Sequence, residues 1–188
     1  MDPGINISMR LRSITESKET LILVDLPYGM DDLSPVMGRE SIKYHYGVLS
    51  QGYVDRFNND EGDPEFNRAG AMLHNLFWPQ LMPPKINNQP KGSSLGLIEK
   101  VHGDWIDFRD AFIKAAVDFQ GSGWIYLARD GSIKSLTNQS WKSDIIMPID
   151  IWEHTYFLDY PADKKTYMRN VWRIINWNVV NDRINIGG

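Results

Sequence analysis

Apolar and aromatic side chains recur every three or four positions in two stretches of the first half of the chain, the spacing of an amphipathic helix. The first stretch runs from Ser41 to about Asn59. The second runs from Glu65 to about Leu81. It begins after Asp63-Pro64, which provides a helix cap with proline in the first turn, and it stops at Pro83-Pro84. The pattern predicts an antiparallel helical hairpin.

The second half changes from helical to strand-like patterning and back. Helical spacing from Leu95 to about Phe119, interrupted at Gly103-Asp104, predicts two helices. Three short runs rich in β-branched and aromatic residues then predict a small antiparallel sheet: Trp124 to Leu127, Ile133 to Leu136 and Ile145 to Ile149. Two further helices are expected at Trp152 to Tyr160 and Tyr167 to Val180, with Pro161 between them.

Together these elements predict an α+β fold: an N-terminal long antiparallel helical hairpin followed by a C-terminal domain with a small three-stranded antiparallel sheet and surrounding helices. The stretch from Pro83 to Ser94 is rich in proline, asparagine, glycine and serine and indicates a linker. We therefore expect a flexible N-terminal arm (1–20), a hairpin domain (21–85) and an α+β domain (86–188).

Composition excludes several classes of protein. The 188 residues include 20 Lys+Arg and 24 Asp+Glu, and this mildly acidic balance argues against sequence-independent nucleic-acid binding. Cysteine is absent, which excludes disulfides and thiolate metal sites and fits a reducing compartment. No apolar run approaches the roughly 20 residues of a membrane span. The acidic N-terminus does not resemble a signal or transit peptide, so we expect a cytoplasmic protein without membrane partners.

Four histidines occur in the chain: His45, His74, His102 and His154. His45 and His74 lie in the two helices of the predicted hairpin, whose packing could bring the imidazoles face to face. His154 follows Asp150 by four residues, so this carboxylate and imidazole can converge on one ion. Three imidazoles and one carboxylate suit a first-row transition metal. On spacing alone, a hydrogen-bonded core histidine is the commoner explanation for each.

Six motifs surround these residues: Tyr44-His45-Tyr46-Gly47, Tyr53-Val54, His74-Asn75-Leu76-Phe77-Trp78, Gly121-Ser122-Gly123-Trp124, Asp150-Ile151-Trp152-Glu153-His154 with Leu158-Asp159-Tyr160, and Asn176-Trp177. In this order they resemble the iron/manganese superoxide dismutase family from about Leu26 to Val180. The resemblance implies that the 86–188 domain helps to bind a metal. It also implies His45, His74, Asp150 and His154 as ligands of one manganese or iron ion per subunit, and it gives His102 no ligand role.

The resemblance also implies a polar contact beside the ligands. Tyr53 lies eight residues, about two helical turns, after His45, so its phenol can point toward the same site. In the family the matching tyrosine joins a glutamine that comes from either the second helix or the sheet. Here the helical position is Gly70 and the sheet supplies Gln139, which resembles the manganese pattern. A role for Gln139 in a turn is the alternative.

Five further residues match family positions. Trp78, Trp124 and Trp152 resemble the aromatic shell of the metal, although a tryptophan is more often a core residue. Glu153 matches the acid that bridges to the other subunit, which implies a homodimer or a tetramer of two such dimers. An exposed surface glutamate is the alternative. Lys164 lies near the place of the family's steering arginine.

The chain also departs from the family pattern. Leu49-Ser50 stand where the family has a histidine pair, Phe157 replaces the tyrosine that faces it across the dimer, and Val48 replaces a lysine. Because both ends of that hydrogen bond become apolar together, no buried partner is left unpaired, which would cost about 1–3 kcal/mol. The departures indicate a repacked entrance and a weaker positive funnel.

The resemblance implies an antioxidant oxidoreductase whose partner is the superoxide anion, disproportionated to dioxygen and hydrogen peroxide with manganese preferred over iron. The alternative is a structural or interaction protein that keeps the fold and the metal site without turnover, which the altered entrance favours. A metal-dependent hydrolase has no separate general base in view.

Overall fold

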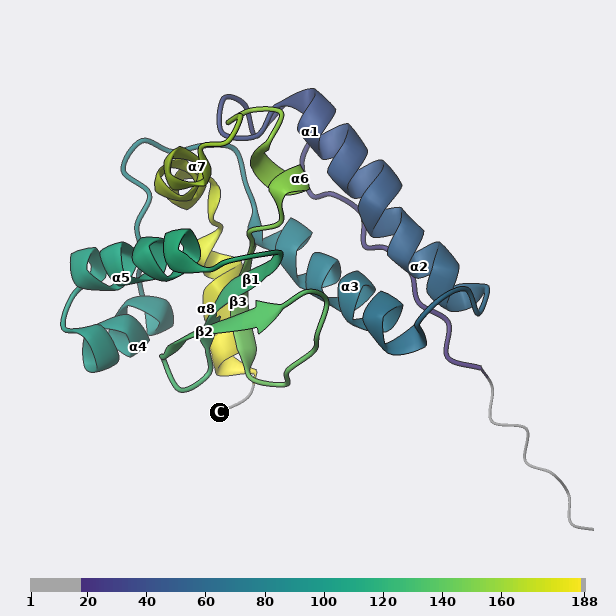
Figure 1. Ribbon diagram of the computed structural model, residues 1–188. Helices are drawn as coiled ribbons and strands as arrows, with labels where there is room; N and C mark the ends of the chain where they lie inside the picture. Colours follow the sequence, from purple (N-terminus) through teal and green to yellow (C-terminus); the bar gives the residue numbers. More distant parts are fainter. Residues whose placement is uncertain (1–17, 187–188) are drawn as a thin grey trace, which may run out of the picture.

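The computed structural model describes residues 18–186 and shows a helical hairpin packed beside an α+β body (Figure 1). The first arm of the hairpin is continuous and consists of α1 (Arg39–Tyr44), the π-helical η1 (His45–Ser50) and α2 (Gln51–Asn58). The second arm is α3 (Pro64–Phe77), which ends in the 3-10 turn η2 (Trp78–Gln80). The side chain of Asp63 accepts a hydrogen bond from the Phe66 N–H and caps α3, as the sequence predicts.

The π-helical segment η1 is a departure from the regular helix that the periodicity predicts. Its backbone hydrogen bonds span five residues, where those of an α-helix span four. The N–H of Gln51, for example, donates to the carbonyl of Tyr46. Such segments change the angular position of side chains within an otherwise regular helix, and they are frequent at functional sites. In this chain the widened turn begins at His45, one of the predicted ligands.

The body confirms the predicted order of two helices and a three-stranded antiparallel sheet. The strand order is β2-β1-β3, so β1 is central and places Trp124 opposite Asp150 of β3. All side chains of β1 and β3 are buried, whereas only Leu136 of β2 is, which suits an edge strand. The bounds are α4 (Ser93–His102), α5 (Trp105–Asp118), β1 (Gly123–Ala128), β2 (Ile133–Thr137) and β3 (Ile145–Asp150).

The two C-terminal helices differ from the prediction. The helix expected at Trp152 to Tyr160 is only the short α6 (Glu153–Tyr156), and the one expected at Tyr167 to Val180 is broken. The chain is extended at Ile175, which bridges to Leu81, and the N–H of Asn176 donates to the Gln80 carbonyl at 2.7 Å. These contacts with the end of the hairpin interrupt the helical pattern. The elements are α7 (Lys164–Asn170), η3 (Val171–Ile174) and α8 (Trp177–Asn185).

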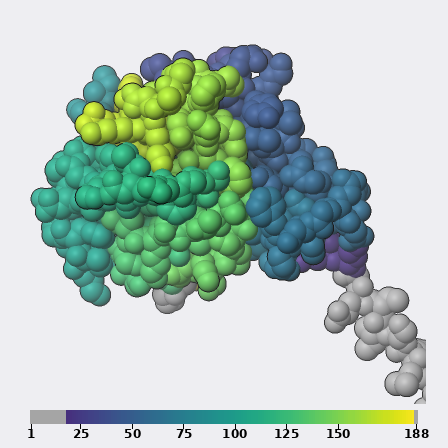
Figure 2. Space-filling model, viewed as in Figure 1, coloured from purple at the N-terminus to yellow at the C-terminus, as the bar shows by residue number. Residues whose placement is uncertain are grey.

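The hairpin and the body form one continuous surface (Figure 2). Residues 18–26 have no regular secondary structure and run along the hairpin. The side chain of Asn58 makes two hydrogen bonds to the backbone of Leu21, and the side chain of Asn75 joins the backbone of Ile22 and Val24. Residues 1–17 of the expected arm lie outside the described residues. Between residues 18 and 186, no helix combines the length and the apolar character needed to cross a bilayer.

Candidate metal centre

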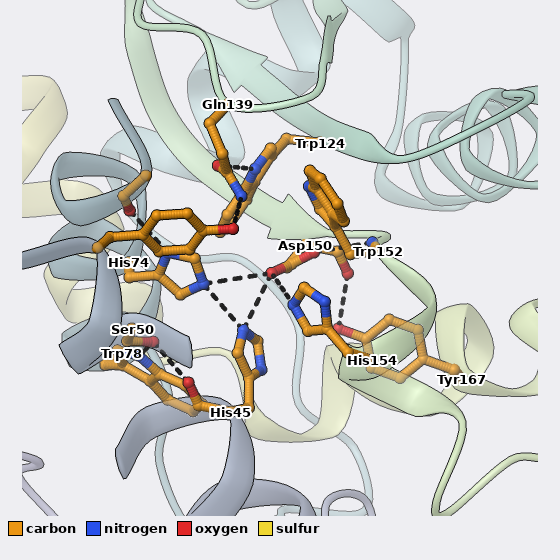
Figure 3. A network of polar contacts seen from close by, with 12 residues as sticks. His45, Ser50, His74, Trp78, Trp124, Gln139, Asp150, Trp152, His154 and Tyr167 are labelled. Atoms are coloured by element: carbon orange, nitrogen blue, oxygen red, sulfur yellow. Dashed lines mark hydrogen bonds and ion pairs between the residues drawn. The ribbon is translucent and has the colours of Figure 1, made fainter. Parts of the chain in front are cut away.

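Four side chains from separate elements converge where the hairpin meets the sheet (Figure 3). His45 comes from η1, His74 from α3, Asp150 from the end of β3 and His154 from α6. One donor atom of each lies within 4.8 Å of the donor atoms of the others. Three of the side chains are fully buried and that of His154 is 18% exposed. The structure therefore brings together the whole predicted ligand set.

The distances between the donor atoms fit a single ion. Nε2 of His45 lies 2.9 Å from Nε2 of His74 and 3.1 Å from Oδ2 of Asp150. The same Oδ2 lies 3.6 Å from Nε2 of His74 and 3.6 Å from Nε2 of His154. Ligand atoms about 2.1 Å from a metal are about 3.0 Å apart at a right angle and about 3.6 Å apart at 120°. All four distances therefore match first-row metal coordination.

The two buried histidines of the hairpin are held in the neutral form that metals bind. Nδ1 of His74 lies 2.6 Å from the Gly70 carbonyl, which can only accept, so Nδ1 donates and Nε2 keeps its lone pair toward the centre. Burial lowers the pKa of His74 to about 3 and also lowers the pKa of His45. Both shifts favour the neutral imidazole.

The carboxylate of Asp150 is oriented by its own backbone surroundings. Its Oδ1 accepts a hydrogen bond of 2.8 Å from the N–H of Trp152, which turns Oδ2 toward the imidazoles. Burial alone would raise the pKa of Asp150, but the facing His154 and His45 outweigh it and hold this pKa below its usual value. Among the described residues, neither Oδ2 nor Nε2 of His154 has a hydrogen-bond partner, although both atoms are buried. A cation would satisfy both.

A second polar chain lies against this cluster. The side-chain amide of Gln139 donates to Oη of Tyr53 at 3.0 Å and accepts from Nε1 of Trp124 at 2.9 Å. The Tyr53 ring stacks on His74 with centroids 5.4 Å apart. Gly70 permits this packing, because a Cβ there would lie 2.7 Å from the Tyr53 ring. Burial raises the pKa of Tyr53, so the phenol keeps its proton.

Each of the three predicted tryptophans packs against a different histidine of the cluster. The ring centroids are 4.7 Å apart for Trp78 and His45, 5.1 Å for Trp124 and His74, and 5.5 Å for Trp152 and His154. Trp78 and Trp124 are fully buried. Together these rings place an apolar wall around the polar centre, which limits the access of water.

Comparison with known proteins identifies the family. The model of the iron/manganese superoxide dismutases, C-terminal domain, matches residues 90–183. The manganese/iron superoxide dismutase of Porphyromonas gingivalis is 30% identical over 188 residues, covering 86% of this chain and 97% of the relative. The chain belongs to the iron/manganese superoxide dismutase family. The iron superoxide dismutase of Pyrobaculum aerophilum is also 30% identical, covering 86% and 90%, and the mitochondrial manganese enzyme of Neurospora crassa is 29% identical, covering 87% and 80%.

In this member of the dismutase family, the outer side of the cluster opens on a surface hollow of about 590 Å³. Glu153 is exposed there beside His154. Phe157, at a family tyrosine position, is 48% exposed in the same hollow. The complete lining is Glu40, Tyr44, Glu153, His154, Phe157 and Leu158. In the single chain, the carboxylate of Glu153 and the apolar side chains of Phe157 and Leu158 are therefore exposed in this hollow.

Two predicted residues have contacts outside the cluster. The ammonium of Lys164 donates to the Phe119 carbonyl at 2.8 Å, so its steering role stays a prediction. His102, which the dismutase resemblance leaves without a ligand role, shares a 2.8 Å hydrogen bond with the Gly131 carbonyl.

Sequence reasoning missed two residues near the ligands of this dismutase-family chain. The hydroxyl of Tyr167 donates to the Asp150 carbonyl at 3.2 Å. Ser50 is fully buried and bonds to the backbone of His45. Its position five residues after His45 is a signal only if the turn is known to be π-helical.

Proposed function

We propose that the protein is a superoxide dismutase that converts two superoxide anions and two protons into dioxygen and hydrogen peroxide. His45, His74, Asp150 and His154 would hold one manganese or iron ion. The observation that carries this proposal is the convergence of three imidazoles and one ionised carboxylate on a buried point, at distances that suit a first-row metal. When bound, the ion supplies a one-electron couple that can accept an electron from one superoxide and return it to the next.

The chain's own residues prepare the site for proton and water control. Because Gln139 donates to Oη of Tyr53, the phenolic hydrogen of Tyr53 is free to be donated elsewhere. The raised pKa of Tyr53 keeps that proton in place at neutral pH. Gln139 is itself fixed by Trp124, so the phenol is held in one orientation. Tyr53 thus stores a proton beside the ligands, while the tryptophan wall excludes bulk water.

Manganese is the ion we propose as preferred, with iron as the other candidate. Gly70 leaves the space that the Tyr53 ring occupies, so the amide donor comes from Gln139 on the sheet side. An amide at this place alters the proton affinity of groups around the metal and hence its potential, which links the donor's position to the metal.

We also propose a homodimer, with a tetramer of two such dimers as the further assembly, in a reducing compartment such as the cytoplasm. Exposed Tyr44, Phe157 and Leu158 surround Glu153 in the outer hollow, which supports association through this face. The absence of cysteine from the sequence fits the compartment. The division into a hairpin part (21–85) and a metal-binding α+β part (86–188) is likewise a proposal, in which each part supplies two ligands.

Metal analysis combined with a superoxide assay tests the function. We expect one manganese or iron ion per chain, dismutation in at least one of the two forms, and higher activity with manganese. Zinc-loaded protein is the matched control, because zinc has no redox couple and should give no activity. If the manganese-loaded and the iron-loaded protein each contain one ion per chain and neither is active, the alternative is favoured: a structural or interaction protein that keeps the fold and the metal site without turnover.

A further inference from the structure

The two buried histidines of the hairpin are held in different ways. His74 is oriented by its outer ring nitrogen, because Nδ1 donates to the Gly70 carbonyl at 2.6 Å. Within residues 18–186, Nδ1 of His45 has no hydrogen-bond partner, although the atom is buried. Metal-binding histidines usually have their second nitrogen fixed by such a partner. Apart from the contacts of Nε2 within the ligand cluster, the orientation of the His45 ring therefore comes from its backbone and from the rings packed against it.

Ser50 connects both of these supports. Its hydroxyl donates to the carbonyl of His45 at 2.8 Å and accepts from Nε1 of Trp78 at 3.0 Å. These roles are fixed, because a carbonyl can only accept, an indole nitrogen can only donate, and a serine has one hydroxyl hydrogen. Ser50 and Trp78 are both fully buried, so no bulk water replaces either bond.

The same hydroxyl thus fixes both the backbone that carries the His45 ring and the indole that packs against this ring. On one side it fixes the first residue of the π-helical turn from which the ring projects. On the other side it fixes the indole of Trp78, whose centroid lies 4.7 Å from the His45 ring at an interplanar angle of 66°. If the hydroxyl is removed, the indole N–H is left buried and unpaired, and the indole must move to find a partner.

We propose that Ser50 is a positioning residue that aims Nε2 of His45 at the metal by fixing both the turn that carries this histidine and the indole that packs against it. The inference rests on the proposed function, since it concerns the geometry of a metal ligand. In this chain the serine occupies the second position of the histidine pair that the family pattern contains, so the same place in the helix has a different means of support.

The experiment first compares three variants of the iron- and manganese-loaded protein. Ser50→Ala removes the hydroxyl and Ser50→Thr retains it. Ser94→Ala is the matched control, because Ser94 is also fully buried and its hydroxyl donates to the carbonyl of Lys91 at 3.0 Å, at the start of α4. Metal affinity is measured by competition with a chelator, and ligand geometry by the EPR spectrum of the iron(III) form.

We expect Ser50→Ala to weaken metal affinity about tenfold, the lower end of the range for groups that orient metal ligands, and to change the EPR spectrum. Ser50→Thr and Ser94→Ala should retain the wild-type spectrum. Trp78→Phe provides a second probe that does not depend on the folding of Ser50→Ala, because it removes the indole N–H and leaves the serine. It should change the spectrum as well, and the double variant should show less than the sum of the two effects.

The outcomes separate the two hypotheses. A wild-type spectrum and affinity in both Ser50→Ala and Trp78→Phe overturn the role of Ser50 and leave the proposed function intact. A spectral change in Ser94→Ala equal to that in Ser50→Ala also overturns it, because any lost buried hydroxyl would then have the same effect. Wild-type protein that binds neither manganese nor iron overturns the proposed function, and the positioning role with it.

Discussion

The ligand cluster has an inner and an outer side, and the two differ in how their side chains are satisfied. On the inner side, Tyr53 and Trp124 both bond to Gln139, and all three side chains are buried within one chain. On the outer side, Phe157 and Leu158 are 48% and 57% exposed. The inner side is complete in the monomer, so changes there should alter the metal site and the stability of the fold. Changes on the outer side should alter association.

The largest effect is expected from breaking the centre that both sides share. Asp150→Ala removes the one carboxylate of the cluster and leaves three buried imidazoles without a charge to balance a cation. We expect loss of stoichiometric manganese and iron and, with it, loss of dismutation. Metal analysis of the purified protein measures the first effect and a superoxide assay the second.

Asp144→Ala is the control for this change. Asp144 precedes the same strand, but it forms a partly exposed ion pair with Lys134, and such a pair contributes about 0–1 kcal/mol. Its variant should keep its metal. One equivalent of tightly bound metal in Asp150→Ala would show that the four side chains are not a common ligand set.

The parts of this comparison that the sequence predicted depend on local patterns. Asp150 and His154 are four residues apart in one motif, and Asp63-Pro64 is a local helix start, so neither needs knowledge of the rest of the fold. The same holds for the three strands, because their β-branched and aromatic runs are bounded by turn residues.

The parts that could not be predicted depend on contacts between distant segments. The break before α8 arises because Ile175 and Asn176 bond to Leu81 and Gln80 at the end of the hairpin, whereas the local periodicity is helical. The role of Ser50 likewise requires the indole of Trp78 from the other arm. Periodicity describes which face of a helix is apolar, but it carries no information on which distant group will compete for a backbone or side-chain bond.

A smaller effect is expected from a tight contact on the inner side. Gly70→Ala places a Cβ 2.7 Å from the ring of Tyr53, which must then move away from His74 and Gln139. We expect about 1–3 kcal/mol of destabilisation from overpacking in urea unfolding. Activity should fall as well, because the phenol is displaced, while the metal is retained.

The matched control for this contact is Gly96→Ala, in the middle of α4. A Cβ at Gly96 meets no atom within 4 Å, so alanine should stabilise the helix by about 1 kcal/mol or less. Opposite signs of the stability change at the two glycines would identify the Tyr53 contact as the cause. A neutral Gly70→Ala variant with full activity would mean that the inner side tolerates movement and is less rigid than its hydrogen bonds indicate.

The smallest effect on the fold is expected from the outer side. Leu158→Glu adds a charge to a side chain that is 57% exposed, so the stability of the single chain should change by about 0.5 kcal/mol or less. If a second copy covers the hollow, the same charge would be buried against Phe157 or Tyr44 and should shift the protein from dimer to monomer in sedimentation analysis. Ile106→Glu, on α5 and 49% exposed, is the control that should leave the dimer intact.

A dimer that persists in Leu158→Glu would place association on another face. The exposed Glu153 would then be an ordinary surface residue, and one chain would contain the whole site.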